Sequence, residues 1–359
     1  MKAITSIASI FVGASLICST AFAEDKKPAI AVFGDWPYNN FLLENASRLV
    51  DSVNSDPSVR WVLHVGDIHS GSQPCTSAKI LRPISTSNPG WNQSVFAQFQ
   101  KFKSPLVYTP GDNEWSDCHK TKEGKSGQPL KELTAVRELF FARPGKTLGL
   151  EEKDVWSQAE KADKAFPADA KFVENVMWYD FGVVFVTLNV PGSNNDTRPW
   201  TNGFEDAAHA TEVQERTDAN IRWLKKAFDM ARLSLARGVV IAIQADMWDP
   251  EALLSGGDGL DAYTPFVQQL SASVRQFGRP VLLLNGDSHV FKADRPLADP
   301  QSASGQVHKV PATPNLQRIV VQGSTTAPAE WLRLTLDPTS RDVFSWTNVP
   351  YCADPTGAC

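Results

Sequence analysis

The sequence predicts an α/β fold in which short buried strands alternate with amphipathic helices. Apolar runs of strand length recur along the chain, and several are followed by segments with apolar residues at helical spacing. The chain has 359 residues, of which 42% are hydrophobic and 21% charged, a globular composition long enough for two domains or one large α/β domain. The net charge of −5 gives no basic footprint for binding nucleic acid or anionic membranes.

The first residues have the pattern of a secretory signal peptide. Lys2 precedes an apolar stretch over residues 3–17, and Ala21-Phe22-Ala23 supplies small residues for cleavage after Ala23. The stretch is too short for a membrane span. We therefore expect residues 1–23 to be removed and the mature protein to be exported, periplasmic or secreted, with no membrane span.

The expected strands are apolar, β-rich runs bounded by glycine, proline or aspartate. They are residues 28–34, 59–65, 105–109, a hairpin over 178–190, 239–243, 281–284, 317–321, 332–336 and 343–346. The expected helices carry apolar residues on one face. They are residues 41–53, 91–102, 131–141, 211–237 and 266–277. One main domain over 24–345, with a polar insertion near 118–175, is thus expected before a tail over 346–359.

Four of the expected strands end in the dipeptide Gly-Asp. These are Gly34-Asp35, Gly66-Asp67, Gly111-Asp112 and Gly286-Asp287. In open α/β sheets the carboxyl ends of strands form the functional edge, and glycine allows a tight turn there. One Gly-Asp is usually a turn, but four would gather carboxylates that repel one another unless a cation balances them. Because carboxylates are ligands for hard divalent cations, the pattern predicts a metal site.

Four cysteines follow the signal peptide and allow three pairings. Cys352 and Cys359 close a short loop near the end of the chain, and by elimination Cys75 pairs with Cys118. Both bonds suit an oxidising compartment, and four free thiols are the alternative. Since Cys75 and Cys118 each follow a Gly-Asp motif closely, a bond between them would brace two loops of the predicted site.

In order and spacing, these motifs resemble the calcineurin-like metallophosphoesterase superfamily. The segments that carry the resemblance are Gly34-Asp35-Trp36-Pro37, Gly66-Asp67, Gly111-Asp112-Asn113-Glu114 and Asn285-Gly286-Asp287-Ser288-His289, which lie within residues 29–291. The Gly-Asp-Trp opening is also similar to that of purple acid phosphatases. The resemblance implies a β-sandwich flanked by helices, a four-layer α/β/β/α fold. It also implies a two-metal centre at the strand ends that hydrolyses phosphate mono- or diesters of a small molecule.

The resemblance also implies a set of metal ligands. Asp35 and His289 would bind the first ion, Asp67 would bridge both, and Asp112 and Asp287 would bind the second. A further ligand position falls in the segment Ile243-Gln244-Ala245-Asp246. Gln244 has the register and Asp246 is the better ligand, so both are candidates.

Several positions depart from the family pattern. Pro37 replaces a ligating histidine, and His69, two residues past Asp67, is the nearest substitute. Asn113 replaces a histidine that assists the transferring phosphoryl group in the family. Leaving-group protonation would then fall to solvent, His119 or metal-bound water. For His64, near Asp67, a core role is the alternative to a functional one.

The donor set favours two Mn²⁺ or Mg²⁺ ions over a Zn/Fe pair, because oxygen ligands outnumber imidazoles. In the loop 191–200, Arg198 could pair with a phosphate and Trp200 could stack on a ring, and an ordinary solvated loop is the alternative. The favoured function is an exported metal-dependent phosphoesterase. A non-catalytic metal- or phosphate-binding protein on the same fold is the second candidate. A serine hydrolase comes last, because no Gly-x-Ser-x-Gly motif is present.

Overall fold

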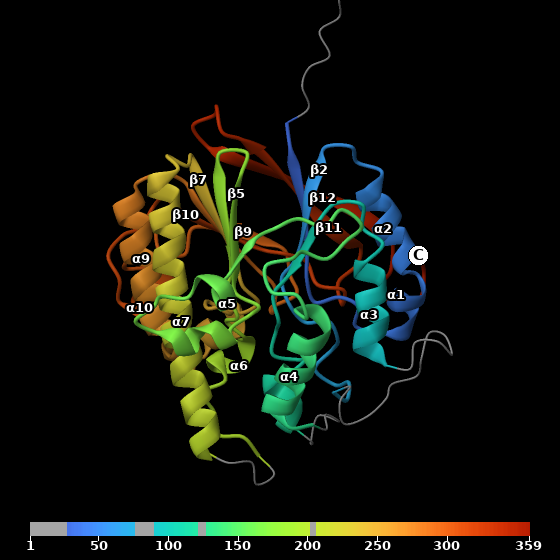
Figure 1. Ribbon diagram of the computed structural model, residues 1–359, viewed down its shortest axis with the longest axis horizontal. Helices are drawn as coiled ribbons and strands as arrows, with labels where there is room; N and C mark the ends of the chain where they lie inside the picture. Colours follow the sequence, from blue (N-terminus) through green and yellow to red (C-terminus); the bar gives the residue numbers. More distant parts are fainter. Residues whose placement is uncertain (1–26, 76–89, 121–126, 202–205) are drawn as a thin grey trace, which may run out of the picture.

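Two mixed β-sheets lie face to face, with helices on their outer sides (Figure 1). The computed structural model describes residues 27–75, 90–120, 127–201 and 206–359. The expected signal peptide and its cleavage site after Ala23 lie outside these residues. The α/β class predicted from the sequence is confirmed.

The first sheet has five strands in the order β12-β11-β1-β2-β3. Its strands are β1 (Ala29–Phe33), β2 (Val59–His64), β3 (Leu106–Tyr108), β11 (Ala329–Asp337) and β12 (Val343–Cys352). Strands β1, β2 and β3 are parallel, and β11 pairs antiparallel with both β1 and β12. The three parallel strands therefore end at one edge of the sheet.

The second sheet has seven strands in the order β4-β5-β6-β7-β8-β10-β9. Its strands are β4 (Trp156–Ser157), β5 (Val176–Asp180), β6 (Val183–Thr187), β7 (Gly238–Ala242), β8 (Val281–Asn285), β9 (Lys292–Asp294) and β10 (Leu316–Val320). Strands β6, β7, β8 and β10 are parallel, and the remaining pairings are antiparallel. The expected hairpin is β5–β6, and the insertion contributes the edge strand β4.

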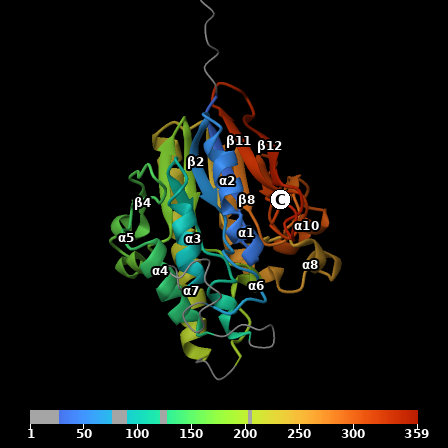
Figure 2. The same cartoon turned by 90° about the vertical axis from the view of Figure 1, so that its right-hand side faces the viewer.

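The helices connect the strands on the outer faces, and Figure 2 shows α1, α2 and α3 in front of the first sheet. The α-helices are α1 (Asn40–Glu44), α2 (Ala46–Asn54), α3 (Trp91–Phe99), α4 (Pro129–Phe140), α5 (Gln158–Lys161), α7 (Asp206–Leu233), α8 (Pro250–Leu254), α9 (Thr264–Phe277) and α10 (Ala303–His308). The segment labelled α6 (Gly192–Asn195) is a short turn with left-handed backbone. Short 3₁₀ turns are η1 (Ser116–His119), η3 (Pro167–Lys171) and η4 (Leu260–Tyr263). None of the helices in the described part of the chain has the length and apolar character to cross a bilayer.

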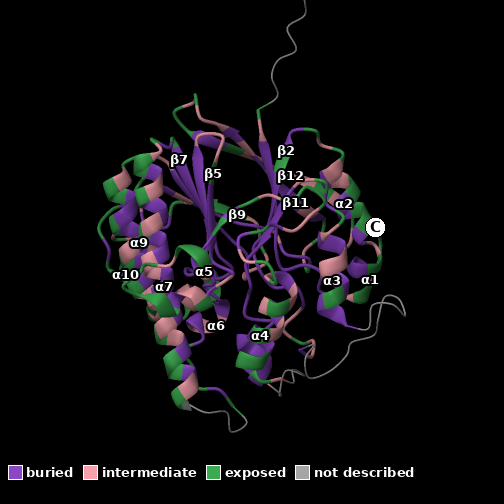
Figure 3. Cartoon of the chain, in the orientation of Figure 1, coloured by how far each residue is buried: buried purple, intermediate pink, exposed green. Residues whose placement is uncertain are grey.

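Strand β1 shows how the alternation of side chains builds the core. Ile30 and Val32 point between the two sheets, where they belong to the same cluster as Phe185 and Leu282 of the second sheet. Their neighbour Phe33 points the other way, into a cluster with residues of α2 and α3. A third apolar cluster joins the far side of the second sheet to α7 and α9. Because both faces of the central strands are covered, these strands are apolar throughout, and Figure 3 shows the central strand β7 as buried.

Both expected disulfides are present, so the alternative of four free thiols is excluded. The Cα atoms of Cys75 and Cys118 lie 5.9 Å apart, and those of Cys352 and Cys359 lie 4.4 Å apart. We expected a tail from residue 346, but β12 continues to Cys352 and pairs with β11 over its whole length. The segment outside the sheet is therefore the short loop closed by Cys352 and Cys359.

Candidate metal centre

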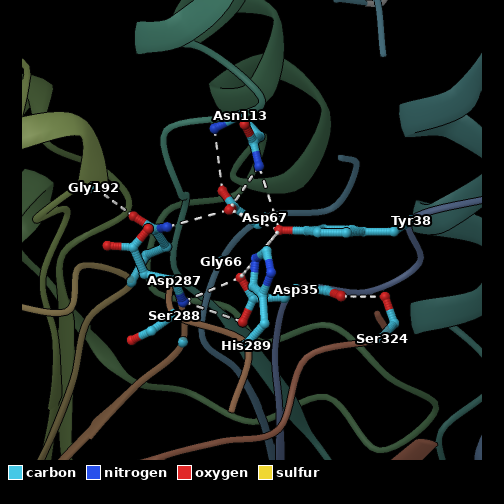
Figure 4. Close-up of polar contacts among 12 residues, drawn as sticks. Asp35, Tyr38, Gly66, Asp67, Asn113, Gly192, Asp287, Ser288, His289 and Ser324 are labelled. Atoms are coloured by element: carbon cyan, nitrogen blue, oxygen red, sulfur yellow. Dashed lines mark hydrogen bonds and ion pairs between the residues drawn. The ribbon is translucent and has the colours of Figure 1, made fainter. Parts of the chain in front are cut away.

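The site lies where strands of both sheets end. Asp35 follows β1, Asp67 follows β2, and Asp112 lies four residues past β3. From the second sheet, Gln244 follows β7, and Asp287 and His289 follow β8. The side chains drawn in Figure 4 converge from these loops on a small polar centre.

The glycines of the Gly-Asp motifs are needed because these loops approach one another closely. A Cβ atom on Gly111 would lie 2.1 Å from Asp67 Oδ1, and one on Gly286 would lie 2.4 Å from Asp35 Oδ2. The backbone also adopts the left-handed region at Asp35 (φ 47°), Asp67 (φ 60°) and His289 (φ 63°). Non-glycine residues held in this region cluster at functional sites, where surrounding structure compensates for the strain.

Asp35, Asp67 and His289 form one half of the site, together with Tyr38. Ligand atoms of the first three lie within 4.8 Å of one another. The hydroxyl of Tyr38 is 3.1 Å from Asp35 Oδ1, 3.0 Å from Asp67 Oδ2 and 3.2 Å from His289 Nε2. His289 Nε2 is 3.4 Å from Asp35 Oδ1. With metal–ligand bonds of about 2.1 Å, neighbouring ligands of an octahedral site lie about 3 Å apart, so this donor set fits one small divalent cation.

Asn113 holds Asp67 in place from the adjacent loop. Its side-chain amide donates to Asp67 Oδ2 at 2.8 Å and to the Tyr38 hydroxyl at 3.3 Å, and its backbone N–H donates to Asp67 Oδ1 at 3.1 Å. Both oxygens of Asp67 thus have a donor from Asn113, which fixes the carboxylate plane. In this position Asn113 orients the Asp67 carboxylate. The motif resemblance places Asn113 at the substrate.

Asp112, Asp287 and Gln244 form the other half of the site. The Gln244 amide donates to Asp112 Oδ1 at 3.1 Å and to Asp67 Oδ2 at 3.2 Å. The second oxygen of Asp112 accepts a hydrogen bond of 2.7 Å from the Ser193 hydroxyl. Asp287 Oδ2 accepts from the backbone N–H of Asp246 at 2.9 Å. Every one of these contacts is made by a protein donor.

Of the two candidates after β7, only Gln244 faces the site. The side chain of Asp246 forms an ion pair with Arg318, which is itself fully buried, and accepts hydrogen bonds from Ser288 and the backbone of Trp248. Arg318 also binds Asp294 through two nitrogens, at 2.9 and 2.7 Å. Asp246 therefore belongs to a buried ionic network behind the loop that carries Asp287.

Burial and mutual repulsion change the acidity of the site. Burial, and then the charge of Asp112, raise the pKa of both Asp67 and Asp287 well above the usual range of a carboxyl group. Burial and the charges of Asp35 and Asp67 raise the pKa of Tyr38 well above 10. Burial lowers the pKa of His289, but the hydrogen bond and charge of Asp35 outweigh it and leave the pKa raised. The site thus gathers more negative charge than it can hold without a proton or a cation.

The other predicted residues lie outside this cluster. His69 is buried, but it is not part of the group formed by Asp35, Asp67 and His289. His119 Nδ1 accepts a hydrogen bond of 3.0 Å from the backbone N–H of Thr201, so that nitrogen carries no proton. Arg198 is exposed and pairs with Asp258 at 3.3 Å. Trp200 is buried, and its indole N–H donates to Asp196 at 2.9 Å, so its ring is not an open stacking surface.

His64 has a structural role. Its side chain is 1% exposed, its Nε2 lies 2.9 Å from the carbonyl oxygen of Trp36, and its Nδ1 accepts the backbone N–H of Gly66 at 3.2 Å. This arrangement requires the neutral imidazole with its proton on Nε2. Burial lowers the pKa of His64 to about 3.

A pocket of about 420 Å³ opens beside the site. Its lining includes His289, Asp287, Val290, Phe291, Asp249 and Glu251. This volume lies in the range of small-molecule sites. The pocket gives a ligand access to His289 from outside.

Two contributors, Tyr38 and Ser193, were not anticipated. Tyr38 lies three residues past Asp35 in the first motif, whereas the resemblance to purple acid phosphatases points to a substitute for Pro37 after the second motif. Ser193 comes from a loop far from Asp112 in sequence, and no local pattern places it there.

No family model matches the chain, and no curated protein matches it. A solved structure with a similar arrangement is described as "GAP50 the anchor in the inner membrane complex of Plasmodium". It is 8% identical, the match covers 90% of this chain and 89% of that one, and the TM-score is 0.41.

Proposed function

We propose that this protein is an exported, divalent-metal-dependent phosphoesterase that acts on a small phosphorylated molecule. The observation that carries the proposal is the group of donors on Asp35, Asp67, Tyr38 and His289, which are spaced as neighbouring ligands of one cation. The motif resemblance supports the same reading and extends it to a metallophosphoesterase-type four-layer fold. The two disulfides are compatible with export.

The donors are three oxygens and one imidazole nitrogen, which favours Mn²⁺ or Mg²⁺ over zinc. A divalent cation held there would supply Lewis-acid charge to a phosphate oxygen and lower the pKa of a bound water. Asn113 holds the Asp67 carboxylate in one plane by donating to both of its oxygens. The pocket beside His289 would receive the organic part of the ester.

Few side chains in the site could act as the general acid that protonates the leaving group. Asn113 carries no ionisable proton, and its amide already donates to Asp67 and Tyr38. Esters with good leaving groups would therefore be favoured. We expect nitrophenyl phosphates to be hydrolysed much faster than alkyl phosphates, and equal rates would reveal a competent acid elsewhere in the site.

The test is hydrolysis of nitrophenyl phosphate and bis-nitrophenyl phosphate by the mature protein with a panel of divalent ions. Turnover that depends on Mn²⁺ or Mg²⁺ is expected, and Asp67→Asn should abolish it. Asp258→Asn makes the same chemical change at an exposed residue outside the site and should leave turnover intact. No turnover with any ion would contradict the enzyme, and the ratio of the two esters assigns mono- or diesterase activity.

The second candidate function is binding of a metal or phosphate without turnover. It is favoured by the absence of a proton donor at Asn113 and by the inward position of Tyr38, whose hydroxyl contacts all the donors of the first half. Thermal stabilisation by Mn²⁺, in protein that hydrolyses neither ester, would support this reading over the first.

A further inference from the structure

The two halves of the site differ in the groups that lie between their carboxylates. In the half with Asp35, Asp67 and His289, the donors face one another across a common point together with Tyr38. In the half with Asp112 and Asp287, N–H and O–H groups of the protein point at the carboxylate oxygens. Protein N–H and O–H groups also contact Asp35 and Asp67. The difference is that, among the described residues, the first half brings two carboxylates and an imidazole nitrogen within 4.8 Å of one another, whereas the Gln244 amide lies between Asp67 and Asp112.

The orientation of Gln244 is fixed by a contact on its far side. Its amide oxygen accepts a hydrogen bond from the backbone N–H of Gly192. Turning the amide over would set an NH₂ group against that N–H, so the oxygen must stay there. The NH₂ group consequently lies between Asp67 and Asp112 and donates to both. Gln244 therefore bridges these two carboxylates as a donor and offers no lone pair to a metal between them.

The loop after β6 closes the remaining space in this half. A Cβ atom on Gly192 would lie 2.8 Å from Asp287 Oδ1 and 3.0 Å from Asp112 Oδ2, so the chain itself packs against both carboxylates. The next residues, Ser193, Asn194 and Asn195, are all left-handed, with φ of 49°, 59° and 53°. Such a run is uncommon for residues with side chains.

This strained loop is held from outside by α7. Arg216, fully buried, donates to the side-chain oxygen of Asn195 at 2.6 Å and to its carbonyl at 3.0 Å. The guanidinium is paired with Glu212 at 2.8 Å. Movement of the loop to admit an ion would have to break these buried contacts.

The Ser193 hydroxyl connects Asp112 to the ammonium group of Lys120. Lys120 Nζ is 2.8 Å from the Ser193 hydroxyl oxygen, which in turn is 2.7 Å from Asp112 Oδ2. Lys120 also pairs with Asp117 at 2.6 Å. The hydroxyl and the ammonium group together offset part of the negative charge that a second cation would otherwise balance.

We propose that each chain binds one divalent cation, in the half formed by Asp35, Asp67, His289 and Tyr38, and that the Gln244 amide takes the place of a second ion. The inference rests on the metal site of the proposed function but not on hydrolysis. It departs from the two-ion centre that the motif resemblance implies.

Metal content and electron paramagnetic resonance test the stoichiometry directly. Mature protein saturated with Mn²⁺ and freed of excess ion should retain one Mn²⁺ per chain and give the six-line spectrum of an isolated ion. Two ions per chain with an exchange-coupled spectrum would overturn the inference and leave the hydrolase intact. One ion without ester hydrolysis would support it and contradict the enzyme, and no bound ion would overturn both the inference and the metal site.

A single substitution tests the role of the amide. Gln244→Glu replaces the NH₂ group with an oxygen between Asp67 and Asp112, so the stoichiometry should rise from one to two and the spectrum should become coupled. Gln98→Glu makes the same change in α3, where the side chain contacts Lys101, and should keep one ion. A folded Gln244→Glu protein that still binds one ion would refute the role assigned to the amide.

Discussion

His64 makes the stability of this fold sensitive to acid. The neutral ring accepts the Gly66 N–H at Nδ1 and is 1% exposed, so protonation would bury a charge and set two N–H groups against each other. Its pKa in the folded state is about 3, against 6.5 for an ordinary histidine. Between pH 6.5 and pH 3 the unfolded chain binds a proton on His64 and the folded chain does not. The free energy of unfolding therefore falls as the pH falls.

The expected size follows from the linkage relation. Each pH unit below 6.5 costs about 1.4 kcal/mol, so from pH 7.5 to 4.5 His64 should remove about 2.6 kcal/mol from the free energy of unfolding. His64→Gln cannot be protonated and still offers a donor to the Trp36 carbonyl. It should be about 1–2 kcal/mol less stable than wild type at pH 7.5 because ring packing is lost. At pH 4.5 that difference should shrink or reverse.

Urea unfolding followed by tryptophan fluorescence measures both proteins at the two pH values. Chelator in every sample keeps the carboxylates of the site in the same metal-free state, so that their titration cancels in the difference. If wild type and His64→Gln lose the same free energy between pH 7.5 and 4.5, the assignment of a buried neutral imidazole is wrong.

Three further predictions concern other parts of the molecule. Arg318→Met should destabilise the protein by about 3–5 kcal/mol in urea, because it leaves Asp246 buried without its partner, and adding Asp246→Asn should restore part of the loss. Replacing Cys75 and Cys118 by serine should cost about 4 kcal/mol, against about 2.5 kcal/mol for the Cys352–Cys359 pair, since the first bond closes the longer loop; equal losses would refute the entropic argument. In metal-free protein, the raised pKa values of Asp67 and Asp287 mean that the contribution of these two carboxyl groups to stability is fully present below about pH 4 and is lost as the pH rises through their raised values. Asp67→Asn should therefore raise the melting temperature of the metal-free protein at pH 8 and remove its stabilisation by Mn²⁺, and a lower melting temperature would argue against charge repulsion in the site.

The sequence predicted those parts of the molecule that depend on local pattern. Asp35, Asp67 and Asp287 follow glycine at the ends of apolar runs, and parallel strands bring such ends together. The direction in which the Gln244 amide points was not predictable. It depends on a hydrogen bond from the backbone N–H of Gly192, which lies 52 residues earlier in the chain. A hydrogen bond between two distant loops leaves no repeating pattern in the sequence from which it could be predicted.

Residue type alone does not show whether a side chain already has another partner. Asp246 is the better ligand chemically, yet the buried guanidinium of Arg318 takes its charge. Trp200 suggested a stacking surface, yet its indole is buried and bound to Asp196. Competition of this sort is decided by tertiary packing, which a single sequence does not display.

The donors of the first half come from two separate sheets, and this has a mechanical consequence. Asp35 and Asp67 extend from β1 and β2, whereas His289 extends from the loop after β8. An ion bound by all three would connect the two sheets at the end where these strands stop. Amides of β1 and β8, far from solvent and from each other in the chain, should then slow their hydrogen exchange together when the ion binds.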